Sequence, residues 1–445
     1  MNIAIVGYGL EGKSSYRYFN DLGYKITICD KDVSLVLPEN TESKLGPTYL
    51  DNLGSFDLVV RSAGINPDLI LNKNPGIEEK ITSQLNEFLK VCPTKNIIGV
   101  TGTKGKGTTT TLIYKMLKRS GLEAILGGNI GVPFLSMLEE INQETHVVLE
   151  LSSFQLCDLR EKSPHIAVCL MVVPEHLNWH ASLEEYYEAK TKLFDHQSDE
   201  DLAIFFAGNE NSINIVNKSP GKKIPYFKDP GAYISNNKIR INDIEICDVN
   251  EVKLLGGHNL QNICAAVTAS WQVTKDVDAI KETISSFSGL PHRIEIIGEI
   301  NGVKYVNDSF ATTPETTIAA IKSFKDNEIL IIGGQPKNIG FDDLAEVITE
   351  TNNIKKVIVI GEATPKIVKS LNKFECNNFV VSSAQNINEI MEEIDRQVSA
   401  IKHENQENLV VLYSPACTSF DMFKDYKDRG DQFRQAVQSL VSVAQ

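Results

Sequence analysis

Residues 101–110 read T-G-T-K-G-K-G-T-T-T, and this stretch says more about the fold and function of the chain than any other. The mostly apolar residues 96–100 predict a buried strand before it, and residues 108–119 predict a helix after it. A glycine-rich turn between a strand and a helix directs backbone N–H groups and the positive helix end toward an anion. The stretch therefore predicts a loop that binds a nucleoside triphosphate, with Lys106 reaching the β and γ phosphates.

One residue of this loop departs from the usual pattern. Phosphate-binding loops of this kind carry Ser or Thr directly after the lysine to hold Mg²⁺, whereas this chain has Gly107. Thr108 or Thr109 is therefore expected to supply the hydroxyl. An ordinary glycine-rich turn before a helix is the alternative, but strand, spacing, lysine and hydroxyls together favour phosphate binding.

Length and composition indicate a large, acidic protein. At 445 residues the chain is expected to form two or three domains, since a domain takes roughly 100 to 200 residues. Hydrophobic residues make up 42%, and the formal net charge is -14. Acidic and basic residues are interspersed, without the basic stripe that a nucleic-acid partner requires. Small-molecule partners are expected, and no nucleic acid.

The cysteines and the apolar runs bear on the compartment. The eight cysteines show no C-x-x-C spacing and are expected to be reduced core thiols. Residues 2–6 predict a strand. They carry neither the basic region nor the long apolar segment of a signal peptide. No run of 18 apolar residues occurs in the chain. We therefore expect a cytoplasmic protein without membrane insertion.

Strands and helices alternate along the chain, which predicts an α/β fold with parallel sheets in three domains. We expect a Rossmann-like domain at residues 1–93, a central P-loop ATPase-type domain at 94–291 and a second Rossmann-like domain at 292–445. Polar residues at 208–252, with β-like pieces such as 238–246, predict a small antiparallel excursion of the central domain. The other expected strands are 25–29, 58–60, 124–126, 146–151, 166–172, 202–206, 304–306, 329–332, 356–360 and 409–413.

A second glycine turn, G-Y-G-L-E-G at residues 7–12, follows the first strand. Asp30 ends the next strand about 20 residues later, as in a dinucleotide fingerprint. Such a turn suits NAD, but it also suits the pyrophosphate of any nucleotide diphosphate, with Asp30 near the ribose or base. The nucleotide diphosphate is favoured, because an NAD dehydrogenase leaves the loop at 101–110 unexplained.

Two side chains are placed for chemistry beside the phosphate loop. Glu150 ends an apolar strand, and its carboxylate at the sheet edge is a hard oxygen ligand of the kind that Mg²⁺ takes. His176 follows another strand at the same edge. A solvated glutamate and a structural histidine are the alternatives. Lys190 lies on a predicted amphipathic helix, whose periodicity alone indicates a solvated face.

Nine motifs in the chain resemble those of the Mur ligases, in that family's order and over the whole length. They are T-G-T-K-G-K-G-T-T-T (101–110), G-G-N-I-G (127–131), E-L-S-S-F-Q-L (150–156), E-H-L-N-W-H (175–180), E-A-K (188–190), G-H-N (257–259), L-P-H-R (290–293), N-D-S (307–309) and S-P-A-C-T-S-F-D (414–421). Within the family the sequence is most similar to the branch that adds D-glutamate to UDP-N-acetylmuramoyl-L-alanine.

The resemblance implies an ATP and metal site. Its ATP-binding residues would be Gly102, Thr103, Lys104, Gly105, Lys106, Gly107, Thr108, Thr109, Asn259, Asn262, Arg293 and Asp308. It implies two Mg²⁺ ions, one held by Thr108 and Glu150 and the other by His176 and Lys190. Lys190 matches the lysine that becomes carbamylated in this family. Lys106, Glu150, His176 and Lys190 would be the catalytic residues.

The resemblance also implies two substrate sites. The UDP-substrate positions are Leu10, Asp30, Ser62, Gly64, Asn129 and Ser152. The D-glutamate positions are Thr312, Lys337, Ser419 and Tyr426. Four departures from the family pattern affect contacts to phosphate and D-glutamate: Lys104 for a neutral residue, Gly107 for a hydroxyl residue, Phe310 for a lysine and Tyr426 for the commoner phenylalanine.

The implied activity is ATP-dependent amide bond formation through an acyl phosphate, in peptidoglycan precursor synthesis, by a monomer. Two alternatives stay open. One is a folylpolyglutamate-type ligase, whose loop also reads K-G followed by Ser or Thr. The other is a non-catalytic nucleotide sensor that lost turnover with Gly107 and Phe310.

Overall fold

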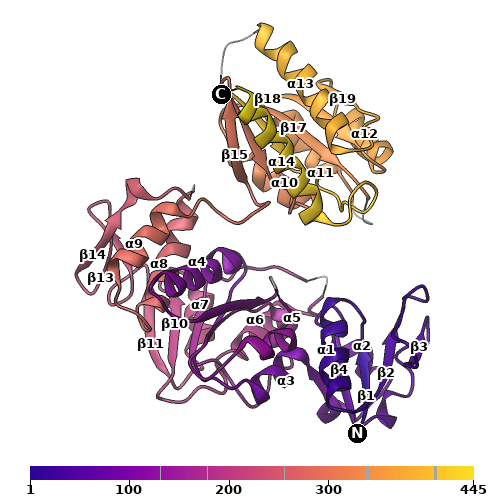
Figure 1. Ribbon diagram of the computed structural model, residues 1–445, viewed down its shortest axis with the longest axis vertical. Helices are drawn as coiled ribbons and strands as arrows, with labels where there is room; N and C mark the ends of the chain where they lie inside the picture. The colour runs from indigo at the N-terminus through magenta and orange to yellow at the C-terminus, as the bar shows by residue number, and fades with distance from the viewer. Residues whose placement is uncertain (131, 178, 255, 337–339, 405–407, 445) are drawn as a thin grey trace. The chain divides into compact units, whose positions relative to one another are not determined.

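The computed structural model describes residues 1–130, 132–177, 179–254, 256–336, 340–404 and 408–444. The chain divides into two compact units, Met1–Phe287 and Ser288–Gln445 (Figure 1). Both are α/β units built on mostly parallel sheets, which confirms the predicted fold class.

The first sheet has five parallel strands in the order β3-β2-β1-β4-β5. The predicted strands at 2–6, 25–29 and 58–60 are confirmed, whereas β3 and β5 are short and were not predicted. The elements are β1 (Asn2–Val6), α1 (Leu10–Asp21), β2 (Lys25–Asp30), β3 (Glu42–Leu45), β4 (Leu58–Arg61), α2 (Pro67–Leu71), β5 (Ile81–Ser83) and α3 (Gln84–Val91).

The second sheet has six parallel strands in the order β11-β10-β9-β6-β8-β7. Its strands are β6 (Ile97–Thr101), β7 (Ala124–Gly128), β8 (His146–Glu150), β9 (Ile166–Cys169), β10 (Leu202–Phe206) and β11 (Lys222–Tyr226). The helices of this part are α4 (Lys106–Arg119), α5 (Ser153–Leu156), α6 (Leu183–Thr191), α7 (Glu210–Val216), α8 (Gly257–Ser270) and α9 (Val277–Ser286).

Two predicted elements differ from the structure here. The strand expected at 166–172 ends at Cys169, because the following backbone bonds to the phosphate loop instead: Thr103 N donates to Met171 O at 2.9 Å. The stretch 238–246 is a hairpin of β13 (Lys238–Ile241) and β14 (Ile244–Asp248). It turns at Asn242 and Asp243, both in the left-handed conformation that two-residue hairpins favour. With β12 (Tyr233–Ser235) it forms the predicted antiparallel excursion.

One buried cluster runs from the first sheet into the second. It includes Ile3 and Ile5 of β1, Val147 and Leu149 of β8, and the side chains between them. Phe88 of α3 and Phe134 join the two parts with ring centroids 6.0 Å apart. Because these two sheets share one core, the structure sets no boundary between them. The domain ranges 1–93, 94–291 and 292–445 stay predictions.

The second unit has a six-stranded sheet in the order β15-β16-β20-β17-β18-β19, with β15 antiparallel to β16. Alternate residues of its strands fill two separate clusters, with Leu330 and Leu412 in one and Ile329 and Val411 in the other. Since neighbouring strand residues point to opposite faces, the sheet is covered on both sides. Its elements are β15 (Glu295–Ile300), β16 (Val303–Asn307), α10 (Pro314–Ile321), β17 (Asn327–Gly333), α11 (Asp342–Glu350), β18 (Ile354–Ile360), α12 (Thr364–Lys373), β19 (Phe379–Val381), α13 (Ile387–Glu404), β20 (Leu409–Tyr413) and α14 (Tyr426–Ala444).

All eight cysteines are free thiols, and six of them are buried. Among the described residues, none of the helices is both long and apolar enough to span a bilayer.

Candidate active site

The loop predicted to bind phosphates connects β6 to α4, as the sequence indicates. Gly102 and Gly105 take positive φ angles of 140° and 86°, which side chains rarely adopt. A Cβ atom on Gly105 would lie 2.1 Å from Asn262 Oδ1, so the loop tolerates only glycine there. The lysine of the loop folds back over it, with Lys106 Nζ donating to Gly102 O and Thr103 O, each at 3.0 Å. Helix α4 begins at Lys106, two residues before the predicted start.

Glu150 lies at the same sheet edge as this loop, because β8 pairs with β6 and Glu150 pairs with Val100. The side chain is only 4% exposed, and its Oε1 accepts a 2.6 Å hydrogen bond from Asn129 Nδ2. Its Oε2 is buried and has no hydrogen-bond partner among the described residues. The alternative of a solvated glutamate is therefore wrong.

The donor atoms at this edge fit a Mg²⁺ ion that also binds phosphate. Thr109 Oγ1 on α4 is, like Glu150 Oε2, a buried oxygen without a partner in the described part of the chain. Thr108 is also largely buried in the first turn of α4. Hard oxygen ligands are those that Mg²⁺ prefers. Because the described residues contain no group of three or more His, Cys, Asp or Glu that could hold a metal, oxygens of phosphate and water would complete the coordination.

His176 follows β9 and adopts the left-handed conformation, with a φ of 60°. Its Nε2 lies 3.5 Å from Glu175 Oε2, and its ring packs 4.8 Å from the ring of Phe154. Burial lowers the pKa of His176; Glu175 opposes that shift, while Lys106 and Lys190 add to it. A neutral imidazole is the form that ligates metals.

Lys190 is buried, so the solvated face that its helical periodicity indicates is wrong. Only 1% of the residue is exposed, and Nζ donates to Gly102 O of the phosphate loop at 3.0 Å. The ammonium also lies 4.6 Å from the centre of the Tyr186 ring. Burial lowers the pKa of Lys190 to about 7, and the positive charge of Lys106 adds to the shift. Helix α6 thus brings this lysine to the loop through tertiary packing, which periodicity does not report.

Most of the residues predicted for the UDP substrate lie around the first glycine turn. Leu10 begins α1 and is 79% exposed, and Ser62 Oγ donates to Gly7 O at 2.7 Å. Asp30 holds the turn, since its carboxylate accepts from Tyr8 N at 2.6 Å and from Asp32 N at 2.9 Å. Gly64 follows Ser62 in the loop after β4.

The two remaining UDP-substrate positions belong to the central sheet. Asn129 bonds Glu150, and Ser152 is the N-cap of α5, in a capping box with Gln155. They therefore lie beside the Glu150 edge, and Gln155, which accepts from Ser152 N, also bonds Glu11 of the glycine turn.

Asn259 and Asn262, predicted to bind ATP, are one turn apart on α8. Asn262 Nδ2 donates to Asn259 Oδ1 at 2.9 Å. The approach of Asn262 to Gly105 places this helix turn directly against the phosphate loop.

Two further predicted ATP-binding positions, Asp308 and Arg293, lie in the second unit. Asp308 accepts from Ser414 Oγ at 2.6 Å and from Ile294 N at 3.1 Å, and burial raises its pKa to about 7. The Arg293 guanidinium lies 4.4 Å from the centre of the Phe310 ring, and that ring is 5.4 Å from Tyr426.

Ser419, Thr312 and Lys337 are the other residues predicted to bind D-glutamate. Ser419 is buried, and its Oγ has no partner among the described residues. Thr312 follows the N-D-S turn, and Lys337 lies outside the described residues.

Two further contacts at these edges do not follow from the sequence pattern. Lys104, which replaces a neutral residue of the family pattern, donates from Nζ to Glu175 Oε1 at 2.6 Å. This bond joins the phosphate loop to the residue before His176. Arg61 is completely buried and pairs with Asp158. In the sequence, the one sign of this buried ion pair is an arginine at the end of an apolar strand, residues 58–61.

Comparisons with known proteins agree on one family. Residues 100–270 match the Mur ligase middle domain, and residues 292–417 match the Mur ligase, glutamate ligase domain. A protein of Acetivibrio thermocellus named UDP-N-acetylmuramoylalanine--D-glutamate ligase is 37% identical over 462 residues, covering 98% of this chain and 96% of the relative. Proteins of that name from Clostridium tetani and Clostridium kluyveri are 36% and 37% identical with the same coverage.

Solved structures show the same fold at lower identity. UDP-N-acetylmuramate-alanine ligase MurC from Thermotoga maritima has a TM-score of 0.55 at 20% identity, covering 99% of each chain. MurF ligase from Thermotoga maritima in complex with ADP has a TM-score of 0.54 at 17% identity, covering 98% of this chain and 94% of that one. With relatives matched over nearly its whole length, the chain belongs to the Mur ligase family.

Proposed function

We propose that this chain is an ATP-dependent ligase that joins D-glutamate to UDP-N-acetylmuramoyl-L-alanine in the synthesis of peptidoglycan precursors. The observation that carries the proposal is the 36–37% identity, over 98% of the chain, to relatives named for that reaction. The arrangement of Lys106, Glu150, His176 and Lys190 around one sheet edge supports it chemically.

The residues of that edge would hold the triphosphate and two Mg²⁺ ions. Bound Mg²⁺ would neutralise phosphate oxygens and so favour attack by a second anion. Glu150 with Thr108 or Thr109 would hold one ion, and His176 with a carbamate on Lys190 would hold the other. Residues 102–109 would bind the phosphates of ATP, and Asn259, Asn262, Arg293 and Asp308 the rest of the nucleotide.

Carbamylation of Lys190 is proposed on its surroundings. Addition of CO₂ requires an unprotonated amine, and burial away from water favours that form of Lys190. The neutral amine adds to CO₂, and the carbamate forms with release of one proton. A carbamate oxygen beside Gly102 and His176 would be a hard ligand where a cation otherwise stands.

The reaction needs an activated acid, because an amine does not displace oxide from a carboxylate. An oxygen of the alanyl carboxylate attacks the γ phosphorus, ADP leaves, and an acyl phosphate forms. Lys106 would stabilise the phosphoryl oxygens during that transfer. The amine of D-glutamate then attacks the acyl carbon, and phosphate leaves with the original carboxylate oxygen. Thr312, Lys337, Ser419 and Tyr426 are proposed to orient D-glutamate.

The UDP-sugar would lie along Leu10, Asp30, Ser62 and Gly64, with Asn129 and Ser152 at its reacting end. All the residues assigned belong to one chain, so we propose that a monomer is sufficient. ATP and UDP-linked sugars are cytoplasmic metabolites, and we propose the cytoplasm as the site of action.

The proposed chemistry predicts a transfer of oxygen. With both alanyl carboxylate oxygens of the UDP-sugar labelled with oxygen-18, each phosphate released should carry one labelled oxygen and the amide product should keep the other. Mass spectrometry of both products checks this. Reactions without D-glutamate serve as the control, since net phosphate release requires the acceptor. Unlabelled phosphate accompanying glutamyl product would contradict the acyl phosphate.

A further inference from the structure

Arg61, the last residue of β4, connects the first sheet to the central one. It is 1% exposed, and all three of its guanidinium nitrogens contact acceptors. Arginine presents its donors in a rigid planar fork, so the acceptors that it bonds are fixed relative to one another. The identity of those acceptors therefore shows which segments Arg61 holds together.

One side of the fork holds the loop after β4. Arg61 Nη1 donates to Ile65 O at 2.7 Å and approaches Ala63 O at 3.3 Å. The same loop carries Ser62 and Gly64, assigned above to the UDP-sugar. Glu11 Oε2 accepts from Ala63 N at 2.8 Å, which binds the loop to the first glycine turn.

The other side of the fork holds α5 and the residues after it. Arg61 Nη2 donates to Phe154 O at 2.7 Å, and Nε donates to Asp158 Oδ2 at 2.8 Å. Helix α5 is capped by Ser152, two residues after Glu150, so this contact reaches the edge where the UDP-sugar and ATP would meet.

A second connection runs parallel to the first. Gln155 of α5 donates from Nε2 to Glu11 Oε1 at 3.0 Å, so the carboxylate that binds Ala63 N also binds the central sheet's helix. Gln155 in turn accepts from Ser152 N through Oε1 at 3.1 Å. Two side chains, Arg61 of β4 and Glu11 of α1, thus join the loop after β4 to α5.

Arg61 also packs near the segment that carries His176 and Trp179. Its guanidinium carbon is 6.0 Å from the centre of the Trp179 ring. Trp179 packs 4.6 Å from Phe154, and Phe154 packs 4.8 Å from His176. The guanidinium therefore supports three segments: residues 62–65, residues 154–158 and the loop of Trp179.

The charge of Arg61 is retained in the interior. Burial lowers its pKa, but Asp158, Cys157 and Glu11 outweigh that effect and leave the pKa above the ordinary value. A buried ion pair is often no more stabilising than a well-packed apolar pair of the same volume. Fixed geometry is what a guanidinium supplies here and an apolar side chain does not.

We propose that Arg61 is a positioning residue that holds the UDP-sugar loop at residues 62–65 in register with α5 and the Glu150 edge. This inference rests on the function proposed above. Arg61 itself would not contact the substrate. It would act through Ser62, Gly64 and Ser152. Loss of the fork would displace the alanyl carboxylate from the triphosphate, and misplacement by about 1 Å can cost on the order of 100-fold in rate.

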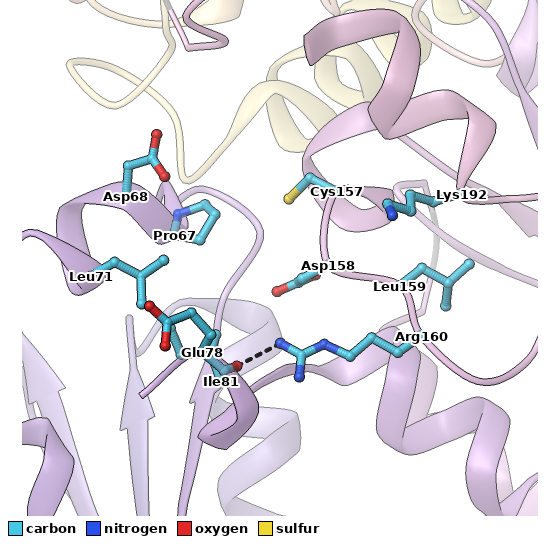
Figure 2. A pocket seen from close by; sticks show the side chains of 10 residues that line it. All are labelled: Pro67, Asp68, Leu71, Glu78, Ile81, Cys157, Asp158, Leu159, Arg160 and Lys192. Atoms are coloured by element: carbon cyan, nitrogen blue, oxygen red, sulfur yellow. Dashed lines mark hydrogen bonds between the residues drawn. The ribbon is translucent and has the colours of Figure 1, made fainter. Parts of the chain in front are cut away.

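A second arginine at the same interface provides a matched control. Beside Arg61 is a crevice of about 220 Å³, lined by Pro67 and Asp68 from the first sheet's side and by Asp158 and Arg160 from the other (Figure 2). Arg160 crosses it and donates from Nη2 to Glu78 O at 2.7 Å (Figure 2). Arg160 thus also joins the two sheets, but its guanidinium bonds Glu78 and Glu79 and not residues 62–65 or α5.

The test compares Arg61→Lys with Arg160→Lys in the full chain. Lysine keeps the charge beside Asp158 but lacks the fork. For Arg61→Lys, the Kd and KM for UDP-N-acetylmuramoyl-L-alanine should rise about tenfold and kcat should fall by a similar factor. The Kd for Mg·ADP, measured by calorimetry, should stay within about twofold, because the guanidinium of Arg61 bonds residues 63–65 and 154–158 and not the phosphate loop. Arg160→Lys should match the wild type.

A double variant separates positioning from an uncompensated charge. Arg61→Met with Asp158→Asn removes both charges, and it should show the same selective loss of UDP-sugar binding while remaining folded. Wild-type UDP-sugar affinity and kcat in both Arg61 variants would overturn the proposal, as would a parallel loss of ADP affinity. A wild-type chain that binds ADP but not the UDP-sugar would instead overturn the proposed function.

Discussion

Replacing Lys190 with alanine is expected to lower kcat about 1,000-fold, at the upper end for loss of one electrostatic group from an active site. The lysine is buried against the phosphate loop, where its carbamate would be a ligand of a Mg²⁺ ion. Alanine removes that ligand and leaves a cavity beside Gly102. Turnover measured by phosphate release at saturating substrates checks the effect.

Chemical rescue distinguishes a lost ligand from lost folding. A short carboxylate such as formate can enter the cavity of Lys190→Ala and supply the missing oxygens, so it should restore part of kcat. Lys192→Ala is the matched control, because Lys192 is the C-cap of the same helix and forms a partly exposed ion pair with Asp195. Full activity in Lys190→Ala would remove the residue from the site.

Replacing Glu328 with glutamine is expected to stabilise the second unit increasingly as the pH rises from 5 to 8. Glu328 is fully buried at the start of β17; Oε1 accepts from Asn353 Nδ2 at 3.2 Å, and Oε2 has no partner among the described residues. Burial raises the pKa of Glu328 from 4.5 to about 8, so the folded chain keeps a proton that the unfolded chain releases.

The sign of the effect follows from that proton. In the wild type, the proton on Glu328 contributes fully to the free energy of unfolding below pH 4.5. That contribution is lost as the pH rises toward 8, because the unfolded state binds fewer protons than the folded state in this window. Glutamine has no charge to lose, so its advantage at pH 8 should be on the order of a few kcal/mol.

Calorimetric unfolding at pH 5, 6.5 and 8 checks the prediction through the transition of the second unit. Glu346→Gln is the control, since it removes the same charge from an exposed position of α11. A constant difference in melting temperature between Glu328→Gln and the wild type over that pH range would contradict it.

The residues that could be predicted are those whose placement follows from local sequence. A strand, a glycine turn and a helix place Lys106, and the end of a parallel strand places Glu150, because carboxyl ends of parallel strands form one edge. The alternation of strands and helices likewise predicted the α/β class that the structure has.

The burial of some residues could not be predicted, because it depends on contacts between distant segments. Lys190 is polar on a helix whose period indicates solvent, yet α6 packs it against Gly102, 88 residues away. Arg61 and Asp158 are 97 residues apart, and neither has a partner that spacing reveals. The sequence predicts one β-like piece at 238–246 where the structure has a hairpin, because the turn residues Asn242 and Asp243 lack the glycine that usually marks such a turn.

Phosphate release from ATP tests the central claim most directly. The full chain, with Mg²⁺ and UDP-N-acetylmuramoyl-L-alanine, is compared with D-glutamate, with L-glutamate and with no amino acid. The account predicts release only when both the UDP-sugar and D-glutamate are present. Equal release with L-glutamate or without an amino acid, or none in any mixture despite ADP binding, would contradict it.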